Sequence, residues 1–214
     1  MRARRKVLDI IVVYTEGADF SVLEKYLGCV SKARKATVLK KAADEDKVQS
    51  LVAALLLRSE LSKRLGIPHK KTVFEKGAHG KPYIRGGGAQ FSVSHTRGAV
   101  CVAVSESDME IGVDIERRDR RIIGKLKERT LSKNELAQLS SDEDFLRMWV
   151  QKEAFLKRTG IGLTTVIRGV DTTVLKDLAV YECGAYFVGV AGTTANEAQV
   201  RVLPLDELLA GFDD

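Results

Sequence analysis

The chain has 214 residues, of which 44% are hydrophobic and 30% are charged. This length allows one compact domain or two small ones packed together, and the composition excludes a disordered chain. The net charge of +6 favours an anionic partner, which could be a nucleic acid, an acidic protein or a phosphorylated small molecule. An aromatic content of 6% argues against a surface that stacks nucleic-acid bases.

Cysteine usage and hydropathy predict a cytoplasmic protein. Cys29, Cys101 and Cys183 are odd in number and far apart, so we expect small buried side chains rather than a disulfide framework. The first apolar run is interrupted by Asp9 and is too short for a secretory leader. The sequence contains no uninterrupted run of about 18 apolar residues, the length that can span a membrane, so no membrane partner is expected.

The first half of the sequence predicts a strand, then helices, then more strands. An apolar run predicts a strand over residues 7–13, and a helix that carries the densest basic stretch is expected over residues 22–41. Apolar residues at three- and four-residue spacing predict a helix over residues 44–65. Glycines make residues 76–88 irregular, so that backbone there can approach a ligand closely.

Two alternating segments, residues 91–94 and 99–104, predict strands joined by a tight turn that carries His95 and Arg97. Thereafter the patterns predict, in order, a strand (110–116), a basic loop (117–121), two helices (132–139 and 142–158), short antiparallel strands (179–181, 186–190 and 199–203) and a helical turn (206–209). A helix-rich and then strand-rich order thus occurs twice. We expect an α+β fold with two α+β halves.

Two carboxylates stand on one face of the predicted strand over residues 110–116. Side chains alternate along a strand, so Gly112, Asp114 and Glu116 share a face, and the two acids are about 6.6 Å apart at Cα. Their oxygens could converge on one hard cation, and Gly112 would leave room beside them. The alternative is a half-exposed strand whose acids face water.

A third carboxylate follows the only tryptophan on the predicted helix over residues 142–158. Trp149, Glu153 and Lys157 stand at successive four-residue steps, so Glu153 lies at the margin of the buried stripe. The alternative is an ordinary ion pair between Glu153 and Lys157. Three acids beside basic residues fit Mg²⁺ held together with substrate phosphates, which His95 and Lys157 could contact. The sequence contains no GxxxxGK[ST], GxGxxG or HExxH motif.

Taken together, five segments resemble the motifs of the surfactin-type 4'-phosphopantetheinyl transferases in order and spacing. They are GKPY (80–83), FSVSH (91–95), GVDIE (112–116), LSKNE (131–135) and WVQKEAFLK (149–157). The resemblance implies transfer of the 4'-phosphopantetheine arm of coenzyme A to a serine of an apo acyl or peptidyl carrier protein of fatty acid, polyketide or nonribosomal peptide synthesis. Adenosine 3',5'-bisphosphate would be released, and nucleic acid would not be a partner.

The resemblance also implies an architecture and a metal site. Two similar α+β subdomains, residues 1–104 and 105–214, would be related by a pseudo-twofold with the ligand cleft between them, in a monomer. Asp114, Glu116 and Glu153 would hold Mg²⁺, for which Mn²⁺ could substitute. The general base that deprotonates the serine would be Glu153, or Glu135 acting through water.

Further residues acquire roles in binding coenzyme A from the same resemblance. His95 and Lys157 would contact the pyrophosphate, Ser94 would lie near the phosphates, and Lys81 would lie near the adenosine end. The family often has an arginine for the 3'-phosphate where this chain has Gln49. The charge could come instead from the nearby basic residues Lys32, Arg34, Lys35 and Lys47.

Two other readings use the same residues. Another Mg²⁺-dependent phosphoryl transferase or hydrolase would use the three acids but would leave the GKPY segment and the second half unexplained. A coenzyme A or nucleic-acid binding module without turnover would have no need of Glu153. A product assay with coenzyme A and an apo carrier protein distinguishes the three.

Overall fold

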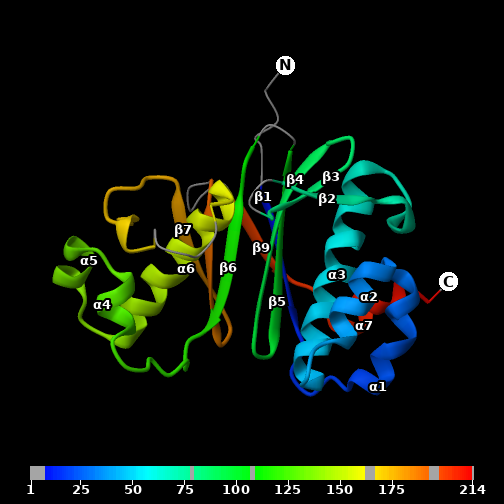
Figure 1. The fold of residues 1–214 in the computed structure, drawn as a ribbon, viewed down its shortest axis with the longest axis horizontal. Helices are drawn as coiled ribbons and strands as arrows, with labels where there is room; N and C mark the ends of the chain where they lie inside the picture. The colour runs from blue at the N-terminus through cyan, green and yellow to red at the C-terminus, as the bar shows by residue number, and fades with distance from the viewer. Residues whose placement is uncertain (1–7, 78–79, 107–108, 162–166, 193–197, 214) are drawn as a thin grey trace.

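Figure 1 shows two β-sheets at the centre of the molecule, with helices on the outer side of each. The computed structural model describes residues 8–77, 80–106, 109–161, 167–192 and 198–213. The predicted α+β class is confirmed. Within these ranges, no helix has the length and apolar character needed to cross a bilayer.

The first half of the chain supplies most of one sheet, a small hairpin and the helices that cover them. Its elements are β1 (Leu8–Tyr14), α1 (Phe20–Leu23), a 3₁₀ helix (Glu24–Cys29), α2 (Lys32–Leu39), α3 (Asp44–Leu65), a 3₁₀ helix (His69–Lys71), β2 (Phe74–Lys76), β3 (Pro82–Ile84), β4 (Ala89–Thr96) and β5 (Ala99–Glu106). The helix predicted over residues 44–65 is confirmed. It ends at Gly66, whose left-handed backbone (φ 66°) suits glycine.

Two expectations for this half are wrong. The helix expected over residues 22–41 is broken, because the backbone is extended at Val30 and Ser31 and the Ser31 hydroxyl caps a new helix by accepting from the Arg34 N–H. His95 belongs to β4 and not to the turn, since the β4–β5 hairpin turns at Arg97 and Gly98.

The second half forms a three-stranded sheet with its own helical cover. Its elements are β6 (Gly112–Arg117), α4 (Leu126–Thr130), α5 (Lys133–Gln138), α6 (Asp142–Thr159), a 3₁₀ helix (Ile167–Gly169), β7 (Leu178–Cys183), β8 (Tyr186–Ala191), β9 (Ala198–Val202) and α7 (Leu205–Ala210). The predicted antiparallel pairing holds for β7 and β8 but is wrong for β9, which runs parallel to β1 at the edge of the first sheet. The order in that sheet is β4-β5-β1-β9. The division at residue 104 stays a prediction, but the last strand returns to the first half.

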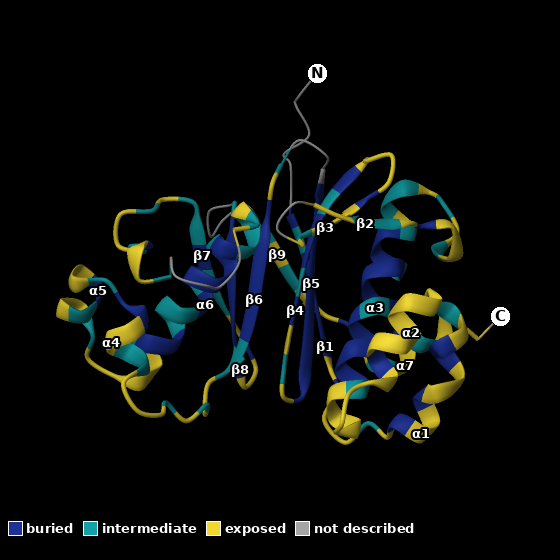
Figure 2. Cartoon of the chain, in the orientation of Figure 1, coloured by how far each residue is buried: buried dark blue, intermediate teal, exposed yellow. Residues whose placement is uncertain are grey.

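Three apolar cores hold these layers together, and Figure 2 shows the central strands as buried. Ile11 and Val13 of β1 pack beneath α3, whereas Ile10 and Val12 face the second sheet. On β5 the residues that face the second sheet are small, namely Ala99, Cys101 and Ala103. The third core lies between the second sheet and α4, α5 and α6. Cys101 and Cys183 are buried as predicted, but Cys29 is half-buried.

Helix α6 lies unusually close to the second sheet because two glycines face it. A Cβ built on Gly112 would lie 1.8 Å from the Ala154 carbonyl oxygen, and one on Gly189 would lie 2.3 Å from the Val150 carbonyl oxygen. The expectation that Gly112 leaves room beside the acids is therefore corrected, because the space is filled by helix backbone. This close approach brings α6 onto the strand face that carries Asp114 and Glu116.

Candidate active site

The two sheets meet along β4 and β6, where hydroxyls of one strand bond to the other. Ser92, Ser94 and Thr96 alternate along β4 and so share one face. The bonds are Val113 N to Ser92 Oγ (3.0 Å), Ser94 Oγ to Asp114 Oδ1 (2.8 Å) and Thr96 Oγ1 to Glu116 Oε2 (3.0 Å). We call these three side chains the seam hydroxyls. They fix β6 and its acids against the first half of the molecule.

Lys157 of α6 reaches into this seam. Its Nζ lies 2.7 Å from Asp114 Oδ1 and 2.7 Å from Ser94 Oγ, so the three side chains form a closed cluster. Asp114 is buried, but its second oxygen, Oδ2, has no hydrogen-bond partner. A buried carboxylate oxygen without a partner is unfavourable unless something binds it.

Glu153 is the second buried acid with an unpartnered oxygen, Oε1. Burial, together with the nearby Asp114 and Glu116 carboxylates, raises the pKa of this carboxyl to about 7, although Lys157 opposes the shift. Because Asp114 and Glu116 both contribute to this shift, Glu153 lies near the two strand acids. Asp114, Glu116 and Glu153 therefore lie near one another, and their role as metal ligands stays a prediction.

Glu116 is the most exposed of the three acids, and each of its two carboxylate oxygens has a partner. Besides the Thr96 hydroxyl, it pairs with the guanidinium of Arg120. Burial raises its pKa, Asp114 adds to the shift, and Arg120 opposes it. Arg120 is a site residue that sequence reasoning missed, although its position four residues after Glu116 was a signal.

The donor set fits a hard divalent cation, because Asp114 Oδ2 and Glu153 Oε1 are buried carboxylate oxygens that lack partners. As the side chains stand, however, no three His, Cys, Asp or Glu side chains among the described residues converge closely enough to hold a metal ion. Lys157 lies against Asp114 and Arg120 against Glu116 instead. Two protein cations thus neutralise two of the three acids.

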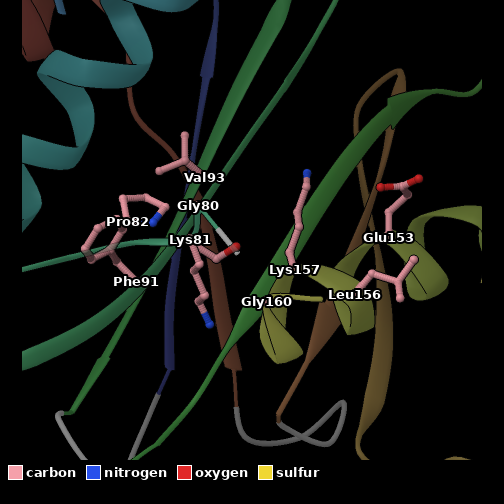
Figure 3. A pocket seen from close by; sticks show the side chains of 10 residues that line it. Gly80, Lys81, Pro82, Phe91, Val93, Glu153, Leu156, Lys157 and Gly160 are labelled. Carbon is pink, nitrogen blue, oxygen red and sulfur yellow. The ribbon is translucent and has the colours of Figure 1, made fainter. Parts of the chain in front are cut away.

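A pocket of about 260 Å³ opens beside these acids, between the two halves of the molecule. Figure 3 shows Glu153, Leu156 and Lys157 from α6 on one side of it, and Pro82, Phe91 and Val93 opposite. The side formed by Pro82, Phe91 and Val93 is apolar, and α6 contributes both Glu153 and Lys157 beside Leu156. Such a pocket suits an uncharged chain that ends in a charged group.

Lys81 lines this pocket with its aliphatic stem but uses its ammonium elsewhere. Its Nζ donates to the Arg158 carbonyl oxygen (2.7 Å), at the end of α6. Desolvation lowers its pKa. The contact shown by the structure is a link from the β2–β3 hairpin to α6, and contact of Lys81 with the adenosine end stays a prediction.

His95 lies at the exposed end of β4 with its Nδ1 3.2 Å from Gln49 Oε1. Desolvation by the groups around it lowers its pKa, and Lys157 and Lys41 lower it further. Gln49, at the position where the family often has arginine, therefore orients His95. This role could not be read from the sequence.

The basic candidates on the first half are less closely tied to the site. Lys32, Arg34 and Lys35 are exposed on α2, and Arg34 is near enough to lower the pKa of His95. Lys47 pairs with Asp44 at 2.7 Å. The structure shows no anion-binding contact for any of the four.

Glu135 lies in a different cluster, which is wholly buried. Its Oε2 lies 2.6 Å from Lys152 Nζ and accepts from the Ser132 N–H, and its Oε1 accepts from Thr172. Lys152 in turn donates to the Ile167 and Val170 carbonyls. Because its acceptors are all engaged inside the protein, Glu135 is corrected from a candidate base to a group that anchors α5 and α6.

Comparison with known proteins identifies the family. Residues 110–189 match the family model of the 4'-phosphopantetheinyl transferase superfamily, and residues 19–108 match that of the 4'-phosphopantetheinyl transferase N-terminal region. The chain belongs to the 4'-phosphopantetheinyl transferase superfamily. The two matches adjoin near the β5–β6 connection, so together they include both strands of the seam and α6.

Curated proteins that are named as phosphopantetheinyl transferases match this chain over part of their length. The chain is 31% identical to 4'-phosphopantetheinyl transferase gsp of Aneurinibacillus migulanus over 63% of this chain and 57% of the relative. It is 29% identical to 4'-phosphopantetheinyl transferase Sfp of Bacillus subtilis over 66% and 65%, respectively. A Xenopus laevis L-aminoadipate-semialdehyde dehydrogenase-phosphopantetheinyl transferase is 28% identical over 63% and 51%. The chain thus spans between half and two thirds of the length of these relatives.

Proposed function

We propose that the protein transfers the 4'-phosphopantetheine arm of coenzyme A to a serine of an apo acyl or peptidyl carrier protein, with Mg²⁺, and releases adenosine 3',5'-bisphosphate. The observation that carries this proposal is the contact of Lys157 with Asp114 near Glu153, where both acids have an unpartnered buried oxygen. Membership of the superfamily supports the reaction class. The surfactin-type class, a pseudo-twofold between the two halves and action as a monomer belong to the same proposal.

In this proposal Asp114, Glu116 and Glu153 hold the divalent cation. Bound there, Mg²⁺ would neutralise the pyrophosphate of coenzyme A and make the phosphorus a better electrophile. Lys157 lies within reach of the same position, so its ammonium can turn from Asp114 to a phosphate oxygen once the acid has another partner. His95, oriented by Gln49, contributes a second donor at the exposed end of β4.

Glu153 is the general base of the proposed reaction. Its Oε1 is buried and has no partner within the protein, so this oxygen is available to accept the serine proton. The serine oxygen forms the new bond to phosphorus as its proton passes to Glu153, and the bond from phosphorus to the nucleotide oxygen breaks. Glu135 is not assigned this role because Lys152 and Thr172 occupy its oxygens.

The pocket between Phe91 and Leu156 is assigned to the pantetheine arm. Its apolar side, which includes Pro82, Phe91 and Val93, would exclude water from an arm that has no charge, and Glu153 and Lys157 line the same pocket from α6. The arm's phosphate would then lie at the acids. Carrier proteins rich in acidic residues suit a chain of net charge +6.

The test is a product assay with the full chain, coenzyme A, Mg²⁺ and several apo acyl and peptidyl carrier proteins. The proposal expects the mass of one phosphopantetheine group to be added to a carrier, together with one adenosine 3',5'-bisphosphate. The control is a carrier whose acceptor serine is replaced by alanine, which should gain nothing. No addition to any carrier tried would contradict the proposal.

A further inference from the structure

Arg120 belongs to the acid site although it lies outside the motifs that define it. It follows β6 on the surface loop, four residues after Glu116, and its guanidinium pairs with that carboxylate. The same guanidinium lies over the ring of Trp149, 5.1 Å from its centroid. Arg120 therefore lies between a candidate metal ligand and an aromatic side chain on α6.

Both oxygens of Glu116 already have partners in this arrangement. Oε1 bonds to Arg120 and Oε2 accepts from the Thr96 hydroxyl. Across the site, Lys157 occupies Asp114 Oδ1 in the same way. A divalent cation that binds Glu116 must compete with the Arg120 guanidinium for the lone pairs of the carboxylate oxygens. Two positive charges held on one carboxylate also repel each other.

We propose that Arg120 is the resident cation of Glu116, that a divalent cation binds the acid site by displacing it, and that Arg120 thereby sets the affinity of the site for the metal. The inference rests on the proposed function only for the assignment of a divalent cation to the three acids. Displacement keeps both protein cations close by. The site then holds the metal, Arg120 and Lys157 against three carboxylates, so its net charge becomes positive and suits an incoming pyrophosphate.

The protein contains its own reporter for this exchange. Trp149 is the only tryptophan in the chain, and the Arg120 guanidinium lies over its ring. Movement of Arg120 away from Glu116 changes this contact. Binding of Mg²⁺, which does not quench fluorescence itself, should therefore change the emission of Trp149.

Arg118 provides a matched control two residues away. It pairs with Glu143 and Glu182 and lies over the Phe187 ring, 5.0 Å from the centroid. Like Arg120, it is an arginine in the loop after β6 that lies over an aromatic ring. Unlike Arg120, it pairs with acids outside the candidate site. A change specific to Arg120 cannot then be ascribed to loss of charge or of stacking in general.

The experiment titrates Mg²⁺ alone, without coenzyme A or carrier protein, into the wild-type chain, Arg120→Gln and Arg118→Gln, by calorimetry and by Trp149 fluorescence. We expect Arg120→Gln to bind Mg²⁺ about three- to fivefold more tightly than wild type, the size expected when one competing, partly exposed ion pair is removed. Arg118→Gln should match wild type. The Mg²⁺-dependent change in Trp149 emission should be present in wild type and much smaller in Arg120→Gln.

Equal or weaker Mg²⁺ binding by folded Arg120→Gln overturns the inference, as does wild-type emission that stays constant while calorimetry shows binding. If Arg120→Gln does not fold, Arg120→Lys replaces it, with tighter binding by a smaller factor expected because lysine lacks the planar fork. A wild-type chain that binds no Mg²⁺ also overturns it. Intact Mg²⁺ binding with no transfer to any carrier overturns the proposed function alone.

Discussion

The two long helices, α3 and α6, cover equivalent outer faces of the two sheets but treat buried charge differently. On α3, Arg58 donates to the His69 and Thr72 carbonyls, and Glu60 binds Lys63 and Arg201. On α6, Lys152 is fully paired with Glu135 and two carbonyls, but the next residue, Glu153, keeps a buried oxygen without a partner.

The difference separates buried charges whose partners lie within the protein from a carboxylate that keeps an oxygen without a partner. A buried charged side chain is compatible with a stable helix if its buried donors and acceptors have partners, as on α3. An unsatisfied carboxylate next to two others lowers stability, and such groups are found where a ligand completes them. Glu153 on α6 is that group.

The largest effect is expected on transfer activity, when Glu153 of α6 is compared with Glu60 of α3. Glu153→Gln should lower the rate of carrier modification by about 10³-fold, because the base and one metal-facing charge are lost. Binding of coenzyme A, measured by calorimetry, should be affected much less. Glu60→Gln, on α3, should keep transfer near the wild-type rate, and comparable losses in both variants would remove the distinction between the helices.

The buried cations of the two helices should differ in stability. Lys152→Met leaves the Glu135 carboxylate buried without its partner and should lower the free energy of unfolding by about 3 to 4 kcal/mol, measured by urea denaturation. Arg58→Met strands only carbonyl oxygens, so its loss should be smaller. The double variant Lys152→Met/Glu135→Leu should recover part of the stability, and no recovery would contradict the ion-pair explanation.

The close approach of α6 to its sheet can be tested at Gly112. Gly112→Ala places a Cβ against the Ala154 carbonyl, and backbone must move to admit it, so we expect a loss of about 2 to 3 kcal/mol in the free energy of unfolding. Gly28→Ala is the control, since a Cβ at that position meets no atom within 4 Å. Thermal melting of the two variants should separate clearly, and equal melting temperatures would count against the packing shown here.

Glu153 should also make the metal-free protein sensitive to pH. Its pKa of about 7 in the folded state exceeds the value of about 4.3 in an unfolded chain, so the folded state holds more protons between these values. The contribution of Glu153 to stability is therefore present below about pH 4.3 and is lost as the pH rises to about 7.

Glu153→Gln removes this titration. With a chelator present, its free energy of unfolding relative to wild type should rise by about 2 kcal/mol between pH 4.5 and pH 8. Urea denaturation at both pH values measures the difference. A constant difference across this range would show that Glu153 has an ordinary pKa.

The smallest effect is expected at the seam hydroxyls. Ser92→Ala removes the acceptor for the Val113 N–H, which is buried, and should lower the free energy of unfolding by about 1 kcal/mol. Ser21→Ala provides an exposed serine for comparison and should be near neutral. Denaturation of both variants checks whether the bonds between β4 and β6 contribute to joining the two halves.

The sequence by itself determined most of the local elements and the identities of the acids. Three- and four-residue spacing predicted α3 to the residue, and alternation correctly placed Asp114 and Glu116 on the same face of β6. The resemblance in the five motifs agrees with the family found by comparison. These features depend on neighbours in the chain, which a sequence displays directly.

Only the tertiary structure decided which side chains meet across the seam and which do not. Glu135 and Glu153 both belong to motifs, but one is closed off by Lys152 and the other keeps an unpartnered oxygen. The contact of Arg120 with Trp149, the contact of Gln49 with His95 and the return of β9 to the first sheet depend on close packing between distant segments. Such contacts follow from the free energy of the whole fold, and the pattern of any one segment does not specify them.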